Sequence, residues 1–119
     1  MNITFEEAIN KTKAEVVKEG FGILTEIDVK ATLKKKLGVD YDNYIILGAC
    51  NPPFAHKAIQ AEKEIGLLLP CNIIVYEDKN QVFVSAILPT VGMSMVDNPL
   101  LINIAKEVEV KLLKAIENI

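Results

Sequence analysis

Residues 71–88, CNIIVYEDKNQVFVSAIL, decide the fold class of this chain of 119 residues. Two runs rich in β-branched residues flank the turn-forming residues Asp78, Lys79 and Asn80, a pattern typical of a β-hairpin with antiparallel strands. Both alternating sets of side chains in these strands are apolar. We therefore expect the hairpin to belong to a sheet that needs cover on both of its faces.

Upstream of the hairpin, the sequence predicts a helix and a strand. Thr4 and Glu7 fit a capping box, and apolar residues at helical spacing extend over residues 5–19. Gly20-Phe21-Gly22 ends this helix. Residues 23–28, ILTEID, alternate loosely between apolar and polar side chains and indicate the first strand.

A short second helix should follow, with Asp28 as its N-cap and Gly38 at its end. Lys34, Lys35 and Lys36 suit the negative end of its dipole. Its buried stripe is predicted to consist of Val29, Thr32, Leu33 and Leu37.

The next strand is predicted over residues 43–50, NYIILGAC, a nearly continuous apolar run typical of a central strand covered on both faces. A helix over residues 53–64 follows, and residues 89–98 form a long connection, either a mobile flap over a pocket or part of a dimer contact. Pro99 then opens the last helix. The order α, β, α, β, α, β, β, α predicts one α+β domain over residues 1–119, with helices packed on an antiparallel-rich sheet.

Charge and hydropathy exclude several classes of function. The net charge is −3, with no basic block beyond residues 34–36, so we expect no nucleic-acid partner. The longest apolar run, residues 65–70, is too short to span a membrane, and the N-terminus lacks a signal pattern. We therefore expect a cytoplasmic protein with no membrane partner. Cys50 and Cys71 match neither a zinc motif nor a disulfide framework, so we expect reduced thiols.

The predicted sheet also points to an assembly. Ile73 and Val75 lie on one side of the hairpin strand, and Ile74 and Tyr76 lie on the other. Helices from one chain cover one face and part of the second, whereas a monomer rarely exposes an apolar patch of more than roughly a few hundred Å². We expect a homodimer formed through the sheet or its edge.

Three stretches resemble a known family: EGFGILTEIDVKATLKKKLG at 19–38, YIILGACNPPFAHKA at 44–58 and EIGLLLPCNIIVYED at 64–78. Together they resemble the bacterial and archaeal family named domain of unknown function 302. The resemblance implies a small α+β domain with an antiparallel sheet, similar in arrangement to one half of the TATA-binding protein, and a homodimer. It implies no activity, because the family has no assigned reaction. Family members begin with a strand before the first helix, and only residues 1–3 are left for it here, so we expect it to be truncated or absent.

Cys50 is the first candidate for chemistry, because it ends an apolar strand just ahead of a helix N-terminus, where ligands often bind. A helix dipole contributes only about 0.3–1 kcal/mol, under about one pKa unit for a thiol that titrates near about 8.5. Activation as a nucleophile would need a further cation, for which His56 and Lys57 are the local choices. The alternative is a buried structural cysteine, which is the commoner case in an apolar strand.

Cys71 starts the hairpin, and its sulfur atom meets that of Cys50 if their two strands are neighbours. The pair would then serve redox chemistry or, with His56, form a set of soft metal ligands that a methionine of GMSM, residues 92–95, could extend. His56 is the only histidine and therefore the candidate general base, against the alternative of a solvated helix residue.

Asn51 and the two prolines after it leave two interpretations open. If Asn51 caps the next helix, Pro52 and Pro53 occupy its first two positions and the Asn51 side chain accepts from the amide of Phe54, which leaves little for an anion. Because a residue before proline avoids the α region, the other interpretation begins the helix at Pro53 and presents Asn51 beside Cys50.

Glu26 and Asp28 lie on one face of the first predicted strand, and paired carboxylates serve acid–base chemistry or bind metals. Asp28 is already explained as a helix cap, whereas Glu26 is not. The candidate catalytic residues are therefore Cys50, Glu26 and His56, and the candidate ligand-binding residues are Cys50, Asn51, His56, Glu26 and Cys71.

Three functions remain open for this chain. The first is a dimeric binding or sensing module that holds a small ligand or a metal near residues 50–53. The second is an enzyme that uses a Cys50 thiolate in redox or transfer chemistry, and the third is a structural or partner-docking domain without a ligand. Neither a phosphate loop nor a dinucleotide fingerprint is present, because Gly20-Phe21-Gly22 precedes a strand instead of following one.

Overall fold

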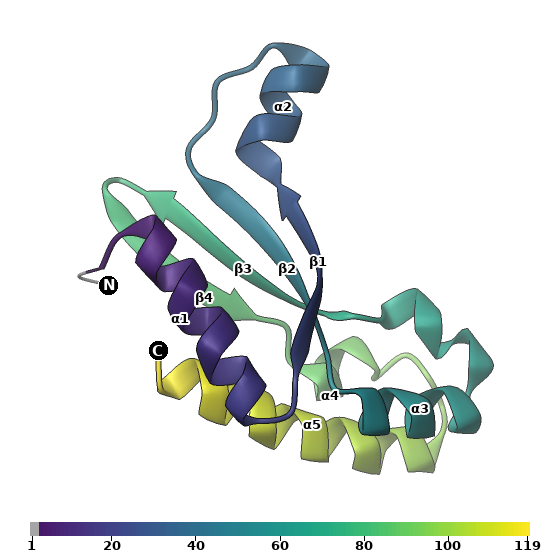
Figure 1. Cartoon of the computed structure of the whole chain (residues 1–119). Coiled ribbons are helices and arrows are strands. Elements are labelled where there is room, and N and C mark those ends of the chain that lie inside the picture. Colours follow the sequence, from purple (N-terminus) through teal and green to yellow (C-terminus); the bar gives the residue numbers. More distant parts are fainter. Residues whose placement is uncertain (1–2) are drawn as a thin grey trace.

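A four-stranded antiparallel sheet forms the centre of the fold in the computed structural model, which describes residues 3–119. Its strands follow one another in chain order, so each strand pairs with the next one along the sequence (Figure 1). This arrangement confirms the predicted α+β class and the hairpin. The strands are β1 (Gly22–Asp28), β2 (Tyr44–Cys50), β3 (Cys71–Asp78) and β4 (Gln81–Ala86).

The main core lies between one face of this sheet and two helices, α1 (Phe5–Lys18) and α5 (Pro99–Glu117). These helices lie side by side across the sheet although they come from opposite ends of the chain (Figure 1). Side chains alternate between the two faces along each strand, so every second residue points into this core. Its fully buried side chains include Leu47, Ile73 and Val75, packed against Val16 and Leu112.

A second, smaller core forms beyond the end of the sheet. It involves α3 (Pro52–Ala61), the 3-10 helix η1 (Lys63–Leu68) and the short helix α4 (Pro89–Gly92), all of which pack near the N-terminal half of α5. The sequence predicted one helix over residues 53–64, whereas α3 begins one residue earlier and ends at Ala61. It ends there because Glu62 adopts an extended conformation before η1 begins. The buried residues of this second core are Ala58, Ile65, Met93, Leu101 and Ala105.

Local capping agrees with the sequence at most helix ends. Thr4 accepts a hydrogen bond from the Glu7 amide at 3.1 Å, and Asp28 accepts one from the Ala31 amide at 2.9 Å. Gly38 ends its helix in the left-handed conformation that the prediction requires. The family's first strand was expected to be truncated or absent here. Ile3 is not in a strand, and Met1 and Asn2 lie outside the described residues.

The second helix, α2 (Val29–Leu37), corrects one prediction. None of its residues is buried, and Leu37, assigned to the buried stripe together with Val29, Thr32 and Leu33, is 69% exposed. Figure 1 shows why: α2 extends past the end of the sheet, where β1 and β2 are its neighbours. A periodic apolar stripe indicates a helix, but it buries nothing when no other layer of the chain reaches it.

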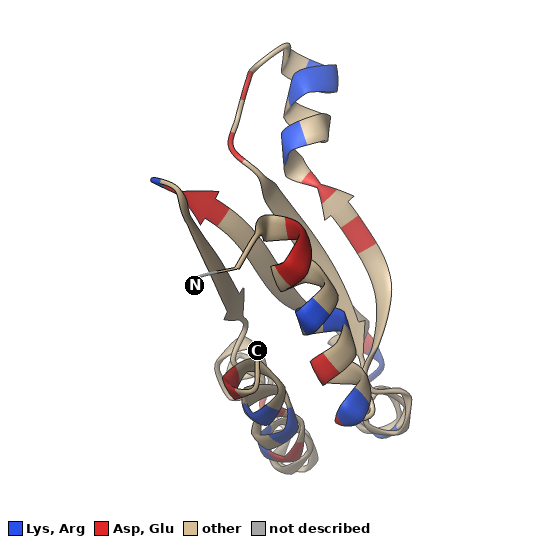
Figure 2. Ribbon diagram, turned by 60° about the vertical axis from the view of Figure 1, so that its left-hand side comes forward, with Lys and Arg blue, Asp and Glu red and all other residues tan. Residues whose placement is uncertain are grey.

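The sheet face opposite α1 and α5 is also less covered than the sequence predicts. It carries a stack of aromatic rings, Tyr44 on Tyr76 and Tyr76 on Phe83, with ring centroids 5.6 and 5.2 Å apart. Phe83 is 37% exposed and Ile27 is 48% exposed. Neither β2 nor β4 contains a charged residue (Figure 2). We call this surface the open face and define it by Ile27, Tyr44, Ile46, Ile74, Tyr76 and Phe83.

Membrane insertion through a helix was not expected from the sequence. In residues 3–119, no helix is both long enough and apolar enough to cross a bilayer.

Candidate functional site

Cys50 and Cys71 come together because their strands are neighbours, as the redox and metal interpretations both require. Strand β2 pairs with β3 so that Ala49 lies opposite Cys71, and Cys50 is the next residue along β2. Both cysteines are free thiols. Cys50 is half-buried at the end of its strand, whereas Cys71 is buried, with only 7% of its surface exposed.

The two thiols line a small cavity between the end of the sheet and the helices. Its volume is about 30 Å³, and its walls come from segments that are far apart in the sequence. Most of these walls are apolar side chains. They include Phe21 before β1, Phe54 and Ala55 on α3, Pro70 before β3, Met93 after α4, and Ile104 and Val108 on α5.

Burial controls the protonation of both thiols. Desolvation raises the pKa of Cys50 above its ordinary value. It raises the pKa of Cys71 as well, and the nearby Cys50 adds to this effect because two thiolates would repel each other. The sequence offered His56 and Lys57 as activating cations, but neither lowers the pKa of Cys50. At neutral pH both sulfur atoms therefore carry protons in the unliganded protein.

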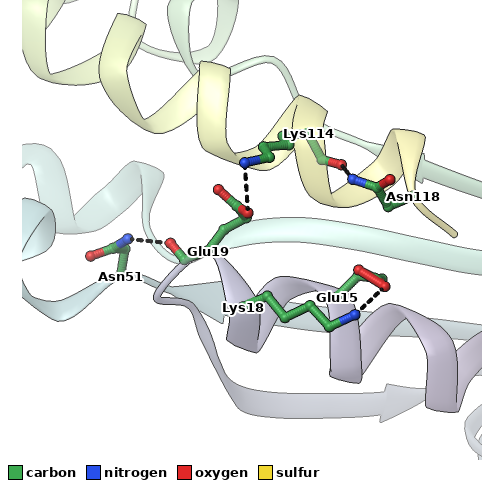
Figure 3. Close-up of polar contacts among 6 residues, drawn as sticks. All are labelled: Glu15, Lys18, Glu19, Asn51, Lys114 and Asn118. Atoms are coloured by element: carbon green, nitrogen blue, oxygen red, sulfur yellow. Dashed lines mark hydrogen bonds and ion pairs between the residues drawn. The ribbon is translucent and has the colours of Figure 1, made fainter.

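Asn51 has a structural role that neither sequence interpretation described. Helix α3 begins at Pro52, so Asn51 occupies the N-cap position, but its side chain makes no capping bond. Its Nδ2 atom instead donates to the carbonyl oxygen of Glu19 at 3.2 Å (Figure 3). Asn51 is only 8% exposed and is therefore not presented to solvent. The φ of Gly20 is +87°, a conformation that favours glycine, and a Cβ atom there would also crowd this Nδ2 atom at 3.1 Å.

His56 does not join the two cysteines. It is exposed on α3, whereas Ala55 and Ala58, three residues apart on that helix, line the cavity. Over the described part of the chain, no group of three or more His, Cys, Asp or Glu residues is placed to hold a metal ion. The set Cys50, Cys71 and His56, which the sequence offered as metal ligands, is therefore not assembled.

Glu26 also lies apart from the thiols. It pairs with Leu47 in the sheet, whereas Cys50 pairs with Gly22, four residues before Glu26 on β1. Its carboxylate forms an ion pair with Lys13 of α1 at 3.0 Å, and both side chains are well exposed to solvent. An exposed pair of this kind stabilises a fold by about 0–1 kcal/mol. Glu26 therefore has a structural explanation, linking α1 to the edge strand.

Met93 also lines the cavity, but the sequence predicted only that one of the methionines in GMSM could join the site. It lies in the connection at residues 89–98, which the structure folds partly into α4, and it is only 6% exposed. Glu109 of α5 holds this segment, because its Oε1 atom accepts from both the amide and the hydroxyl of Thr90, at 3.1 and 2.6 Å. Met95, two residues on, is 83% exposed. The sequence pattern GMSM gave no signal that distinguished these two methionines.

Comparison with known proteins agrees with this fold. The family model described as "Domain of unknown function DUF302" matches residues 1–119. A crystal structure of an uncharacterized conserved protein DUF302 from Bacillus stearothermophilus superposes with a TM-score of 0.91, at 28% sequence identity, over 98% of this chain and 91% of that chain. No curated protein matches. Neither description assigns a reaction or a ligand.

Proposed function

Because the chain belongs to the DUF302 family, whose description names no activity, we propose a function from its own residues: a small binding module that holds a ligand at the cavity between Cys50 and Cys71. One observation carries this proposal. The residues best able to recognise a ligand, Cys50, Cys71 and Met93, line a single small cavity although they come from separate segments of the chain. Cys50 is the half-buried member of this set, so it is the one that solvent can reach.

Binding is favoured over catalysis by the state of the thiols. A catalytic cysteine reacts as the thiolate, which requires a lowered pKa. Burial raises the pKa of Cys50 here, and His56 is exposed on α3 instead of lining the cavity. A redox or transfer enzyme built on a Cys50 thiolate is thus the weaker alternative.

We also propose that the module is a homodimer joined through the open face. The aromatic stack of Tyr44, Tyr76 and Phe83 runs across three strands, and two of these strands, β2 and β4, contain no charged residue (Figure 2). Apolar surface of this kind favours association with a matching surface. The reduced state of both thiols fits a cytoplasmic location, which forms part of the same proposal.

Native mass spectrometry of protein purified from its own source tests the binding function. We expect the measured mass, whether of monomer or dimer, to exceed that of its polypeptide chains alone, and this excess should be lost when Ala55, which lines the cavity, is changed to Leu. Ala31→Leu is the matched control, because Ala31 is exposed on α2. A bare polypeptide mass in the wild type, or a bound mass that survives Ala55→Leu, contradicts the function. A bare mass would favour a structural or partner-docking domain.

A further inference from the structure

Three sulfur-containing residues are the most chemically distinctive feature of the cavity lining. Cys50, Cys71 and Met93 all line it, and its volume of about 30 Å³ leaves room for little more than a single ion or a water molecule. Cys71 and Met93 are nearly fully buried, at 7% and 6% exposure. They come from β3 and from the segment after α4, so the fold and not a local motif brings them to Cys50.

The rest of the lining excludes hard cations. Ca²⁺ and Mg²⁺ take oxygen ligands, and a closed zinc site takes four nitrogen, sulfur or carboxylate ligands. The side-chain amide of Asn51 is the one polar group besides the thiols among the lining residues, and its nitrogen is already bonded to the Glu19 carbonyl. Thiolates and thioethers are soft ligands that suit monovalent copper, and three of them are one fewer than a closed zinc site takes.

We propose that the cavity is a Cu(I) site whose ligands are the Sγ atoms of Cys50 and Cys71 and the Sδ atom of Met93. This inference rests on the proposed binding function and specifies its ligand. Each thiol loses its proton when it binds, so one Cu(I) ion displaces two protons and the oxidation state of copper does not change. The bound unit carries a net charge of −1.

Two features of the fold suit this site: one stabilises the negative charge of the bound unit, and the other gives the ion access from solvent. The N-terminus of α3 begins two residues after Cys50, and the positive end of a helix dipole stabilises a nearby anion. Cys50 itself is half-buried, so the ion can pass from solvent to Cys50 first and then to the buried Cys71 and Met93. Because Cys50 lies nearest to solvent and the other two ligands lie deeper, the ion has the entry path that a metal site needs.

Anaerobic titration of the reduced wild-type protein with Cu(I), in competition with the chromophoric chelator bicinchoninate, tests the site. We expect one Cu(I) per chain to be withdrawn from the chelator. Cys50→Ser and Cys71→Ser should each weaken binding by more than about 100-fold, because loss of even an outer-shell partner of a metal costs about 10–100-fold. Circular dichroism confirms that each variant is folded.

The two neighbouring methionines provide a matched pair that leaves the thiols intact. Met93→Leu conserves volume and removes only the sulfur ligand, so we expect binding about 10-fold weaker in a folded protein. Met95→Leu should bind as the wild type does, because Met95 is 83% exposed and does not line the cavity. Equal effects of the two substitutions, or unchanged binding in Cys50→Ser and Cys71→Ser, overturn the proposed site.

The copper inference and the binding function fail in different ways. If the wild type takes up no Cu(I), while protein from its own source still carries a mass that Ala55→Leu removes, the copper site is wrong and the binding function holds. If Cu(I) is not taken up and the purified protein carries no mass, both are wrong.

Discussion

Contacts of single residues connect the site to the rest of the molecule, and Glu19 at the end of α1 makes two of them. Its carbonyl oxygen accepts from Asn51 at 3.2 Å, and its carboxylate pairs with Lys114 of α5 at 3.7 Å (Figure 3). The turn after Cys50, the end of α1 and the last helix are thus joined at one position. Asn51 contributes to the site by holding the turn in place.

Asn51→Ala should destabilise the fold by about 1–3 kcal/mol, the cost of leaving a buried polar group without its partner. Chemical denaturation measures this change. Asn118→Ala is the matched control, because Asn118 also donates its amide to a helix carbonyl, that of Lys114, at 2.8 Å in an exposed position. The control should change stability by no more than about 0.5 kcal/mol. Equal losses in the two variants would refute the fastening role of Asn51.

The buried thiols predict a stability that falls in alkaline solution. Their pKa values are raised in the folded state, so the unfolded chain loses these protons first as the pH rises. The free energy of unfolding of the reduced, metal-free protein should therefore be constant below the ordinary thiol pKa of about 8.5 and decline above it, until the folded thiols also ionise.

Chemical denaturation of the wild type and of Cys71→Ser between pH 7.5 and 10 measures this effect. All other titrating groups are the same in both proteins, so the difference between the two declines is due to Cys71. The decline should be smaller in the variant, because the more buried of the two thiols is gone. A decline of equal size in both proteins would show that Cys71 has an ordinary pKa in the folded state.

Among the elements, α4 is the one that positions the site. It is a short helix that places Met93 at the cavity, and it depends on the two hydrogen bonds that Thr90 gives to Glu109. Isolated helices of this length are unstable in water, so α4 keeps its shape through such contacts. The region that the sequence described as a flap or a dimer contact is thus held from α5.

Glu109→Ala should loosen α4 and destabilise the protein by about 1–2 kcal/mol, because two hydrogen bonds to a carboxylate are lost. Hydrogen exchange at the Thr90 amide should become faster. Glu107→Ala on the same helix is the control, since Glu107 is exposed, and its effect should stay within about 0.5 kcal/mol. Unchanged exchange at Thr90 in Glu109→Ala would mean that α4 is held by other contacts.

Sequence patterns predicted elements well where the signal was local. The hairpin turn, the caps Thr4 and Asp28 and the stop at Gly38 depend on neighbouring residues, and all are confirmed. The burial of α2 depends on which layers reach it, and periodicity carries no information about that. Likewise, Cys71 was placed correctly on condition that its strand lay beside β2, whereas Met93 could not be told apart from Met95 without the packing of α4.

For the molecule as a whole, the two sheet faces have different environments. Helices α1 and α5 cover one face, while the open face keeps an aromatic stack and half-buried isoleucines near solvent. Apolar patches of this kind mark interaction surfaces more often than they persist in monomers. A second copy of the chain supplies a matching surface in the isologous arrangement common in homodimers.

Phe83→Asp should convert the wild-type dimer into a folded monomer, because it places a charge next to Tyr76 at one end of the aromatic stack. Size-exclusion chromatography with light scattering at tens of micromolar measures the mass. Leu67→Asp is the control: Leu67 lies on η1 and is 82% exposed, so this variant should remain a dimer. A wild-type monomer mass, or an equal effect of both substitutions, would exclude association through the open face.

The central claim is that the cavity at Cys50, Cys71 and Met93 is the binding site of this protein. Natural-abundance methyl NMR compares the protein as purified from its own source with the same protein after unfolding, removal of any ligand and refolding. We predict that the Met93 methyl resonance shifts between the two samples while that of the exposed Met95 does not. Identical Met93 resonances in both samples would contradict the claim.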